Sequence, residues 1–288
     1  MKIAIIDLGS NSARMTVWKI SGSKIEVSVN KRLYVRLSEG LSEDNLIKEE
    51  PFKRTLSALM EFSDIIKYEK CEIVKAVATE TIRRAENSDD ILKIIYAETG
   101  IKVEILTGDD EARYDYLAAK DLTGKQTAFL MDVGGGSIEI IRAENDAVEG
   151  HISLPLGAVV STDKAGADLC ALSKLFTDEF SILPFVNETK NSVIIGLGGS
   201  IRSLFSYADK LYDGATLSRD EFFEVYEKIV TEDREILKQR PNFSDRYDII
   251  NAGLTPYSVL FKLTGAEKII LCNRGVREGI LIECLKKI

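Results

Sequence analysis

Glycine-rich turns are the feature of this sequence best suited to chemistry. Three short runs combine glycine with serine directly after an apolar stretch: Gly9-Ser-Asn-Ser12, Gly134-Gly-Gly-Ser137 and Gly198-Gly-Ser200. Glycine allows a tight turn and lets main-chain N–H groups approach an anion closely. One such turn is a weak signal, because neither a Walker A motif nor a GxGxxG fingerprint is present. Three of them predict a site that holds phosphate.

Two of these turns belong to an internal repeat. The order of apolar run, aspartate, glycine and serine in residues 3–15 recurs with the same spacing in residues 128–140, so that Asp7 corresponds to Asp132. Such self-similarity indicates two related halves, each with a strand, a turn and a second strand. Two ordinary hairpins without a ligand are the alternative, and the aspartate shared by both copies argues against it.

Carboxylates must carry any acid–base chemistry, because His151 is the single histidine of the chain. Glu111 lies near a predicted helix start beside two aspartates, whose charges favour its protonation while the helix dipole opposes it. An acidic first turn that serves only the helix is the alternative. Asp132 and Glu139 lie seven residues apart across a predicted hairpin and could converge on Mg²⁺, which needs few protein carboxylates.

Composition and charge narrow the function classes. The 288 residues suffice for two domains, and no segment is long and apolar enough to predict a membrane span. The net charge of −8 argues against nonspecific nucleic-acid binding, so a polyanionic substrate would need a local basic groove. The start of the sequence lacks the pattern of a secretory signal, which predicts a cytoplasmic protein. Candidates for the basic groove are Arg83, Arg84, Arg202, Arg274 and Arg277.

The four cysteines, Cys71, Cys170, Cys272 and Cys284, match neither a zinc spacing nor a redox pair. We therefore expect them to be buried, reduced thiols.

Strand-like and helix-like segments alternate along the chain, which is typical of an α/β protein. The Thr123-Gly-Lys125 stretch is the best domain boundary. In the first half we expect a third strand at 25–35, a helix from Pro51, a strand at 72–78, a helix from Thr79, a strand at 102–106 and a helix from Gly108 to about Lys120. In the second half we expect strands at 127–132, 138–143, 147–153, 193–197 and 268–271, further helices, and a final helix at 276–285.

Seven motifs in order resemble those of the exopolyphosphatase and guanosine pentaphosphate phosphatase (Ppx/GppA) family. The resemblance covers nearly the whole chain. The seven motifs are Asp7-Leu-Gly-Ser-Asn-Ser12-Ala-Arg14, Ala78-Thr-Glu-Thr-Ile-Arg83, Glu104-Ile-Leu-Thr-Gly-Asp-Asp-Glu111-Ala-Arg113, Asp132-Val-Gly-Gly-Gly-Ser137-Ile-Glu139, Ser153-Leu-Pro-Leu-Gly157, Gly198-Gly-Ser-Ile-Arg202 and Gly275-Val-Arg277-Glu-Gly279.

This resemblance implies an α/β fold of two actin-like (ribonuclease H-like) domains of the sugar kinase and actin superfamily, with a cleft between them. We expect domain I at residues 1–123, completed by the C-terminal helix 276–288, and domain II at residues 124–275. The turns at 9–12 and 134–137 would then face one another across the cleft.

The resemblance also implies hydrolysis of terminal orthophosphate from inorganic polyphosphate, guanosine pentaphosphate, or both. Glu111 would activate the attacking water and Arg83 would contact phosphate. Mg²⁺ or Mn²⁺ would be held by Asp132 and Glu139, with Asp7 as a further candidate. No nucleic-acid or membrane partner is expected, and a homodimer stays open. Phosphate would be bound by Asn11, Ser12, Gly134, Gly135, Gly136, Ser137, Gly198 and Gly199.

The sequence departs from the family pattern at three positions. Ile138 and Ser200 stand where threonine is usual, and Asp110 stands where glutamate is common. The chain ends soon after Gly279, from which we expect less processive action on long polyphosphate. Two alternatives remain: a regulator that binds guanosine tetraphosphate or another nucleotide with weak turnover, and an ATP-dependent kinase of small metabolites or actin-like ATPase. The Glu-Ala-Arg and Arg-Glu-Gly motifs argue against the second alternative.

Overall fold

A computed structural model describes residues 1–187, 189 and 191–287. The chain forms two compact units, Met1–Glu111 with Ile280–Ile288 and Ala112–Gly279. The division falls inside helix α5 (Gly108–Thr123), earlier than the boundary expected after residue 123. It also places the first residues of α12 (Val276–Leu285) with the second unit. Ile288, the last residue of the expected C-terminal helix, lies outside the described residues.

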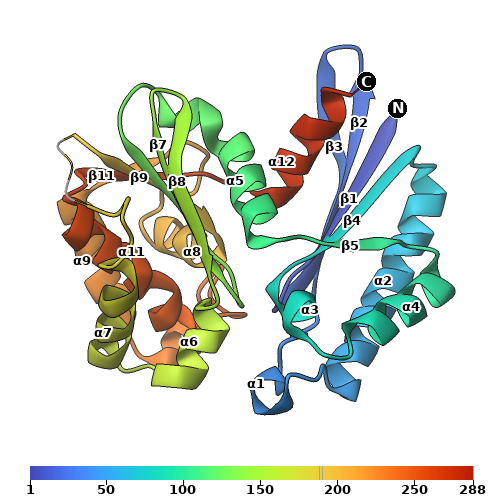
Figure 1. Cartoon of the computed structure of the whole chain (residues 1–288), viewed down its shortest axis with the longest axis horizontal. Helices are drawn as coiled ribbons and strands as arrows, with labels where there is room; N and C mark the ends of the chain where they lie inside the picture. Colours follow the sequence, from blue (N-terminus) through green and yellow to red (C-terminus); the bar gives the residue numbers. More distant parts are fainter. Residues whose placement is uncertain (188, 190, 288) are drawn as a thin grey trace. The chain divides into compact units, whose positions relative to one another are not determined.

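The described part of the first unit contains a sheet in the order β3-β2-β1-β4-β5. Strand β1 is central: it pairs antiparallel with β2 and parallel with β4. Both faces of β1 are covered, which explains its continuous apolar run. Helices α2 and α4 lie together on one face of this sheet (Figure 1). The elements are β1 (Lys2–Leu8), β2 (Ser12–Ser21), β3 (Lys24–Tyr34), α1 (Leu41–Asp44), α2 (Glu49–Glu69), β4 (Ile73–Ala78), α3 (Glu80–Arg84), α4 (Ser88–Thr99) and β5 (Val103–Ile105).

The second unit repeats the strand-turn-strand start of the first. Its described residues form a sheet in the order β10-β11-β9-β6-β7-β8, in which β6 pairs antiparallel with β7 and parallel with β9. The elements are β6 (Ala128–Val133), β7 (Ile138–Glu144), β8 (Ala147–Leu154), α6 (Ala158–Ala165), α7 (Leu169–Phe180), β9 (Val193–Gly198), α8 (Gly199–Tyr207), β10 (Thr216–Ser218), α9 (Arg219–Thr231), α10 (Arg234–Gln239), α11 (Ile250–Thr264) and β11 (Lys268–Leu271).

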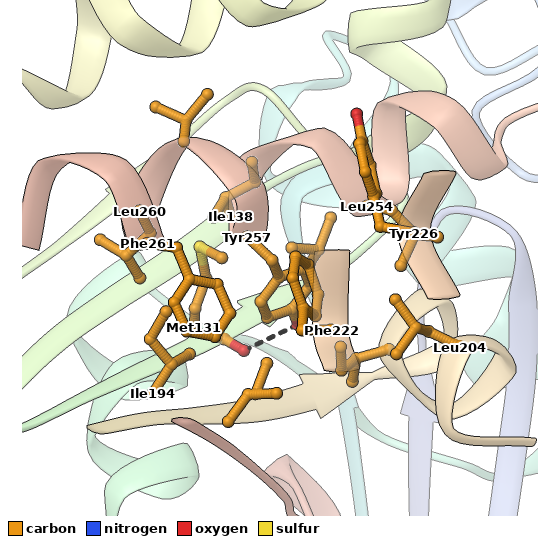
Figure 2. Packing of buried hydrophobic residues seen from close by; sticks show 14 of the residues in the cluster. Met131, Ile138, Ile194, Leu204, Phe222, Tyr226, Leu254, Tyr257, Leu260 and Phe261 are labelled. Atoms are coloured by element: carbon orange, nitrogen blue, oxygen red, sulfur yellow. Dashed lines mark hydrogen bonds between the residues drawn. The ribbon is translucent and has the colours of Figure 1, made fainter. Parts of the chain in front are cut away.

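Side chains of β6 alternate between two cores. Phe129 and Met131 join the larger cluster, which α11 enters with Tyr257, Leu260 and other side chains (Figure 2). Ala128 and Leu130 join a smaller cluster on the other face, together with Ala112 and Ala119 of α5. Because side chains alternate along a strand, Asp132 projects from the same face as Leu130. The face covered by α5 is therefore the one that carries this aspartate.

The helix expected from Thr79 begins there as the short α3, and α4 follows it; the amide of Asn87 between them binds the backbone of Ile47 with both of its polar atoms at 3.0 Å. The expectation that all four cysteines are buried was wrong. Cys170 is exposed, whereas Cys272 is fully buried. Burial is the main cause that raises the pKa of the Cys272 thiol to about 11.

No helix in the described part of the chain combines the length and the apolar character needed to cross a membrane.

Candidate active site

The first glycine turn closes tightly between β1 and β2. The Gly9 N–H donates to the Ser12 carbonyl at 3.1 Å. Asp7 lies directly opposite Arg14 in the antiparallel ladder, so the two side chains share one face of the sheet. The guanidinium Nε of Arg14 donates to the Ser12 hydroxyl at 3.3 Å. The turn therefore places a carboxylate, a guanidinium and a hydroxyl close together.

Neighbouring segments fix the backbone of this turn. The Ser10 carbonyl accepts the Ser38 N–H at 3.1 Å, and the Asn11 carbonyl accepts the Arg36 N–H at 3.0 Å. On the other side, the Thr81 hydroxyl donates to the Ser10 hydroxyl at 2.7 Å. In a trans peptide the C=O and the following N–H point in opposite directions. The N–H groups of Asn11 and Ser12 consequently face away from the 36–38 segment.

Glu111 is held by an arginine of its own unit. It is 5% exposed, in the first turn of α5. Arg83 of α3 donates to Glu111 Oε1 at 2.5 Å and to the Leu106 carbonyl at 2.6 Å, and it forms an ion pair with Glu80. Burial lowers the pKa of Arg83, but the hydrogen bond to Glu111 and the charges of both glutamates outweigh it and raise that pKa overall. The pair is thus a charged guanidinium and a carboxylate.

The acidic first turn of α5 has two separate roles. Asp110 caps the helix: its carboxylate accepts the Thr107 hydroxyl at 2.7 Å, and the Thr107 hydroxyl accepts the Asp110 N–H at 3.1 Å. This reciprocal pattern stabilises a helix start. The purely structural interpretation of the turn therefore applies to Asp110. Glu111 pairs instead with the half-buried Arg83, and a positive charge at this distance favours the charged form of the glutamate. This effect is the opposite of the one expected from the neighbouring aspartates.

The second glycine turn closes in the same way as the first. The Gly134 N–H donates to the Ser137 carbonyl at 3.0 Å, which matches the Gly9–Ser12 bond in the repeat. The start of α6 covers the turn. The Gly134 carbonyl accepts the Ala158 N–H at 2.9 Å, and the Gly136 carbonyl accepts the Gly157 N–H at 3.0 Å.

This arrangement leaves the amides of the turn oriented away from α6. The Gly135 carbonyl also accepts from α6, at 3.0 Å from the Val159 nitrogen. Since all three carbonyls of the glycines point to the helix, the following N–H groups of Gly135, Gly136 and Ser137 point the other way. Successive N–H groups with a common direction form a concave site that suits an anion. The shared direction of these three amides is compatible with the phosphate site predicted from the sequence.

Asp132 and Glu139 are direct cross-strand partners in the β6–β7 ladder. Their side chains therefore lie on the same face, although their spacing in the sequence left this open. Glu139 is 3% exposed and accepts the Ser153 hydroxyl at 2.7 Å. Like charges directly opposite one another destabilise a ladder unless a cation or a proton compensates them.

This carboxylate pair fits a hard divalent cation. Mg²⁺ uses one or two protein carboxylates and takes its other ligands from water and phosphate. Across the residues that the structure describes, no group of three or more histidine, cysteine, aspartate or glutamate side chains is placed to hold a metal ion. A cation here would therefore depend on water and substrate oxygens. In the first unit the position of Glu139 is taken by Arg14, so Asp7 faces a guanidinium instead of a second carboxylate.

The third glycine turn begins α8. Gly198 has a φ of 89°, which favours glycine, and a Cβ on it would overlap Asp132 Oδ1. The guanidinium of Arg246 lies against Gly199, where a Cβ would be 2.6 Å from Cζ. Arg246 is 8% exposed and pairs with Asp245 at 2.6 Å, and its Nε has no hydrogen-bond partner among the described residues.

Two positive groups thus meet at this turn, since a helix N-terminus also carries partial positive charge. An anion bound there would interact favourably with both the Arg246 guanidinium and the N-terminus of α8. Arg246 was absent from the residues predicted from sequence, because nothing in its local pattern connects it with Gly199. Asp115, which is 1% exposed in α5, was missed as well: a Cβ on Gly275 would lie 3.7 Å from Asp115 Oδ1 and 4.0 Å from Asp132 Oδ2.

Four of the five arginines proposed as a basic groove, Arg83, Arg84, Arg202 and Arg274, have different environments. Arg84 binds the Asn45 side chain at 3.0 Å, and Arg274 pairs with Asp121 at 2.8 Å and Asp213 at 3.4 Å. Arg202 donates to the Asn273 carbonyl at 2.8 Å. Arg274 is therefore engaged in structural ion pairs. Arg14 and Arg246, which were not among these five, lie at the first and the third glycine turn.

Comparison with protein families decides the relationship. The model of the Ppx/GppA phosphatase family matches residues 16–288. The chain belongs to the Ppx/GppA phosphatase family. A family member of Aquifex aeolicus has a solved structure that superposes with a TM-score of 0.82 at 28% identity, over 100% of this chain and 98% of that one.

Other solved structures support the fold of this Ppx/GppA chain. An exopolyphosphatase from Cytophaga hutchinsonii gives a TM-score of 0.90 at 20% identity, over 100% of this chain and 99% of that one. A Bacteroides thetaiotaomicron protein described as having an actin-like ATPase fold gives 0.50 at 9% identity, over 98% and 95% of the two chains. The two α/β units are actin-like domains, as the sequence predicted.

Curated relatives of this Ppx/GppA chain are longer. A protein of Fusobacterium nucleatum named bifunctional 3-dehydroquinate synthase/phosphatase is 26% identical over 97% of this chain and 46% of its own length. Exopolyphosphatase 1 of Mycobacterium tuberculosis is 32% identical over 55% of this chain and 47% of its own length. The chain thus spans about half the length of these relatives.

Proposed function

We propose that this chain is a phosphohydrolase that releases terminal orthophosphate from a phosphoanhydride, either inorganic polyphosphate or guanosine pentaphosphate. The observation that carries the proposal is the second glycine turn. Three carbonyls of that turn are bound by α6, and the amides that follow them share the opposite direction. The names of the similar mycobacterial and Cytophaga proteins favour polyphosphate as the substrate.

In this proposal the turn amides and the Ser137 hydroxyl bind the oxygens of the phosphate that is transferred. Fixed N–H donors aimed at an anion stabilise charge in a phosphoryl-transfer transition state without reorganisation. The N-terminus of α8 with Arg246 binds a further phosphate oxygen or the neighbouring phosphate of the chain. Asn11 and Ser12 of the first unit have the corresponding role in their own turn, and Asp7 orients Arg14 there.

Glu111 is the proposed general base, which takes a proton from the attacking water. Arg83 keeps Glu111 ionised and fixes the orientation of its carboxylate through the 2.5 Å contact. This assigns Arg83 a positioning role in addition to the phosphate contact that the family resemblance implies. Asp132 and Glu139 would hold Mg²⁺ or Mn²⁺, which supplies positive charge to the phosphate oxygens when bound.

A phosphate-release screen tests the proposal. The protein is incubated with magnesium and polyphosphates of graded length, guanosine pentaphosphate or ATP, and orthophosphate is measured over time. We expect release from at least one of the first two substrates and loss of release in Glu111→Gln. Tight nucleotide binding by titration calorimetry without release would favour a regulator, and phosphorylation of a metabolite by ATP would favour a kinase. Either result would overturn the proposal.

A further inference from the structure

We propose that Tyr257 is a positioning residue: its hydroxyl fixes the end of β6, which carries Asp132, against the end of β9, which carries the third glycine turn. The inference rests on the proposed function, because it concerns how those two strand ends are held for phosphate chemistry. Tyr257 lies on α11 and is 0% exposed.

The phenol hydroxyl bridges two strands. It donates to the Leu197 carbonyl at 2.7 Å and to the Met131 carbonyl at 3.0 Å, and Figure 2 shows the second of these contacts within the core. One hydroxyl proton is thus shared between two acceptors. Met131 immediately precedes Asp132, and Leu197 immediately precedes Gly198. Both bonds therefore act at the last residue before a proposed functional group.

The ends of β6 and β9 are packed so closely that the distance between them can change very little. Asp132 pairs with Leu197 in the parallel ladder, and Val133 pairs with Gly198. The backbone of Gly198 is packed so closely on Asp132 that a Cβ would overlap the carboxylate, and it would lie 3.0 Å from the Val133 carbonyl. A movement of β9 relative to β6 by a few tenths of an ångström therefore changes the environment of Asp132.

Tyr257 acts from the face opposite to the carboxylate. Met131 packs in the same core cluster as Tyr257, while the alternation of β6 directs Asp132 to the face covered by α5. Among the described residues the partners of the hydroxyl are the two main-chain carbonyls, so it is placed to orient Asp132 and Gly198 without contacting substrate.

A second glycine makes room for this contact. A Cβ on Gly196 would lie 3.3 Å from Tyr257 Cε1, 3.2 Å from Ile269 Cδ1 and 2.8 Å from Ile201 Cγ1. A larger residue at Gly196 would press on the ring from the sheet side. The bare backbone of β9 at this position therefore lets the tyrosine reach the two carbonyls.

The test compares two tyrosines of the same core. Tyr257→Phe removes the bridging hydroxyl and keeps the ring. Tyr226→Phe is the matched control, because Tyr226 is 9% exposed, packs in the same cluster and has its hydroxyl 3.1 Å from the Thr255 hydroxyl, away from both strand ends. Both variants should lose a few degrees of melting temperature, since each leaves a buried polar group without its partner.

Three readouts separate positioning from stability. In Tyr257→Phe we expect kcat/KM for polyphosphate to fall about tenfold, the half-saturating magnesium concentration to rise, and amide hydrogen exchange to accelerate in residues 131–137 and 196–200. In Tyr226→Phe we expect none of these changes. If Tyr257→Phe does not fold, Gly196→Ala takes its place, and we expect a smaller change in the same three measurements.

The outcomes distinguish this inference from the proposed function. An active wild-type protein whose Tyr257→Phe variant matches Tyr226→Phe in exchange, or in kcat/KM and magnesium dependence, would overturn the positioning role alone. A wild-type protein that releases no phosphate from any tested substrate would overturn the proposed function and this inference with it. Faster exchange at both segments together with the selective loss of kcat/KM would support both.

Discussion

Replacing Gly157 by alanine should disrupt the second glycine turn. The residue precedes α6 and has an ordinary negative φ, so backbone strain is not the reason. A Cβ at Gly157 would lie 2.5 Å from the Gly135 carbonyl oxygen and 2.5 Å from the Gly136 nitrogen. These are main-chain atoms, which cannot rotate away as a side chain can. The start of α6 and the turn would therefore have to separate by about 1 Å to reach ordinary van der Waals contact.

That separation acts on the four hydrogen bonds that Gly157 and the start of α6 donate to the three carbonyls of the turn, which are 2.9 to 3.4 Å long. Loss of two of them would cost about 2–3 kcal/mol. For a chain of this size, that corresponds to a decrease in melting temperature of about 5–10 °C. The amides proposed to bind phosphate would move with the turn, and the loss of one such donor typically costs about 100-fold in turnover. We expect kcat/KM for phosphate release to fall by about that factor.

The assay combines calorimetry with phosphate release under saturating magnesium. Gly150→Ala is the control, because a Cβ there would crowd the Phe185 side chain at 2.8 Å in the same unit, on the part of the β7–β8 hairpin distant from Ser137. It should lower the melting temperature and leave kcat/KM nearly unchanged. A Gly157→Ala protein with wild-type stability and wild-type kcat/KM would refute the proposed geometry of the turn.

Three further predictions concern the proposed chemistry. Glu111→Gln should lower kcat by about 100-fold with little change in KM, because it removes the base and keeps an oxygen acceptor for the arginine; wild-type kcat in steady-state assays would exclude Glu111 as the base. Asp132→Ala and Glu139→Ala should each raise the magnesium concentration needed for half-maximal rate, measured by titration, and full activity in excess chelator would contradict a metal requirement. Arg246→Gln should weaken inhibition by orthophosphate about tenfold or more, whereas Arg240→Gln, which removes an ion pair with a glutamate outside the turn, should not. Equal inhibition constants for the two arginine variants would contradict an anion site at α8.

Local features of the fold were predictable from sequence because their causes are local. The repeat was found because the glycine and serine that follow Asp7 have the same spacing as those that follow Asp132. Both turns close with the same type of bond, from the glycine N–H to the serine carbonyl. The strands followed from short apolar runs bounded by turns. The break between α3 and α4 was missed, because the Asn87 amide binds a backbone segment 40 residues away.

The sequence by itself determined the internal repeat, the α/β class and most of the candidate carboxylates and glycines, since each of these features depends on a few neighbouring residues. Tertiary structure decided which of these side chains meet. Only the ladder register placed Glu139 opposite Asp132, and only the packing of distant segments brought Arg246 to Gly199 and the Tyr257 hydroxyl to the ends of β6 and β9. Such contacts join residues that are tens of positions apart in the sequence. Local periodicity does not predict them, because they form only when whole helices and strands pack together.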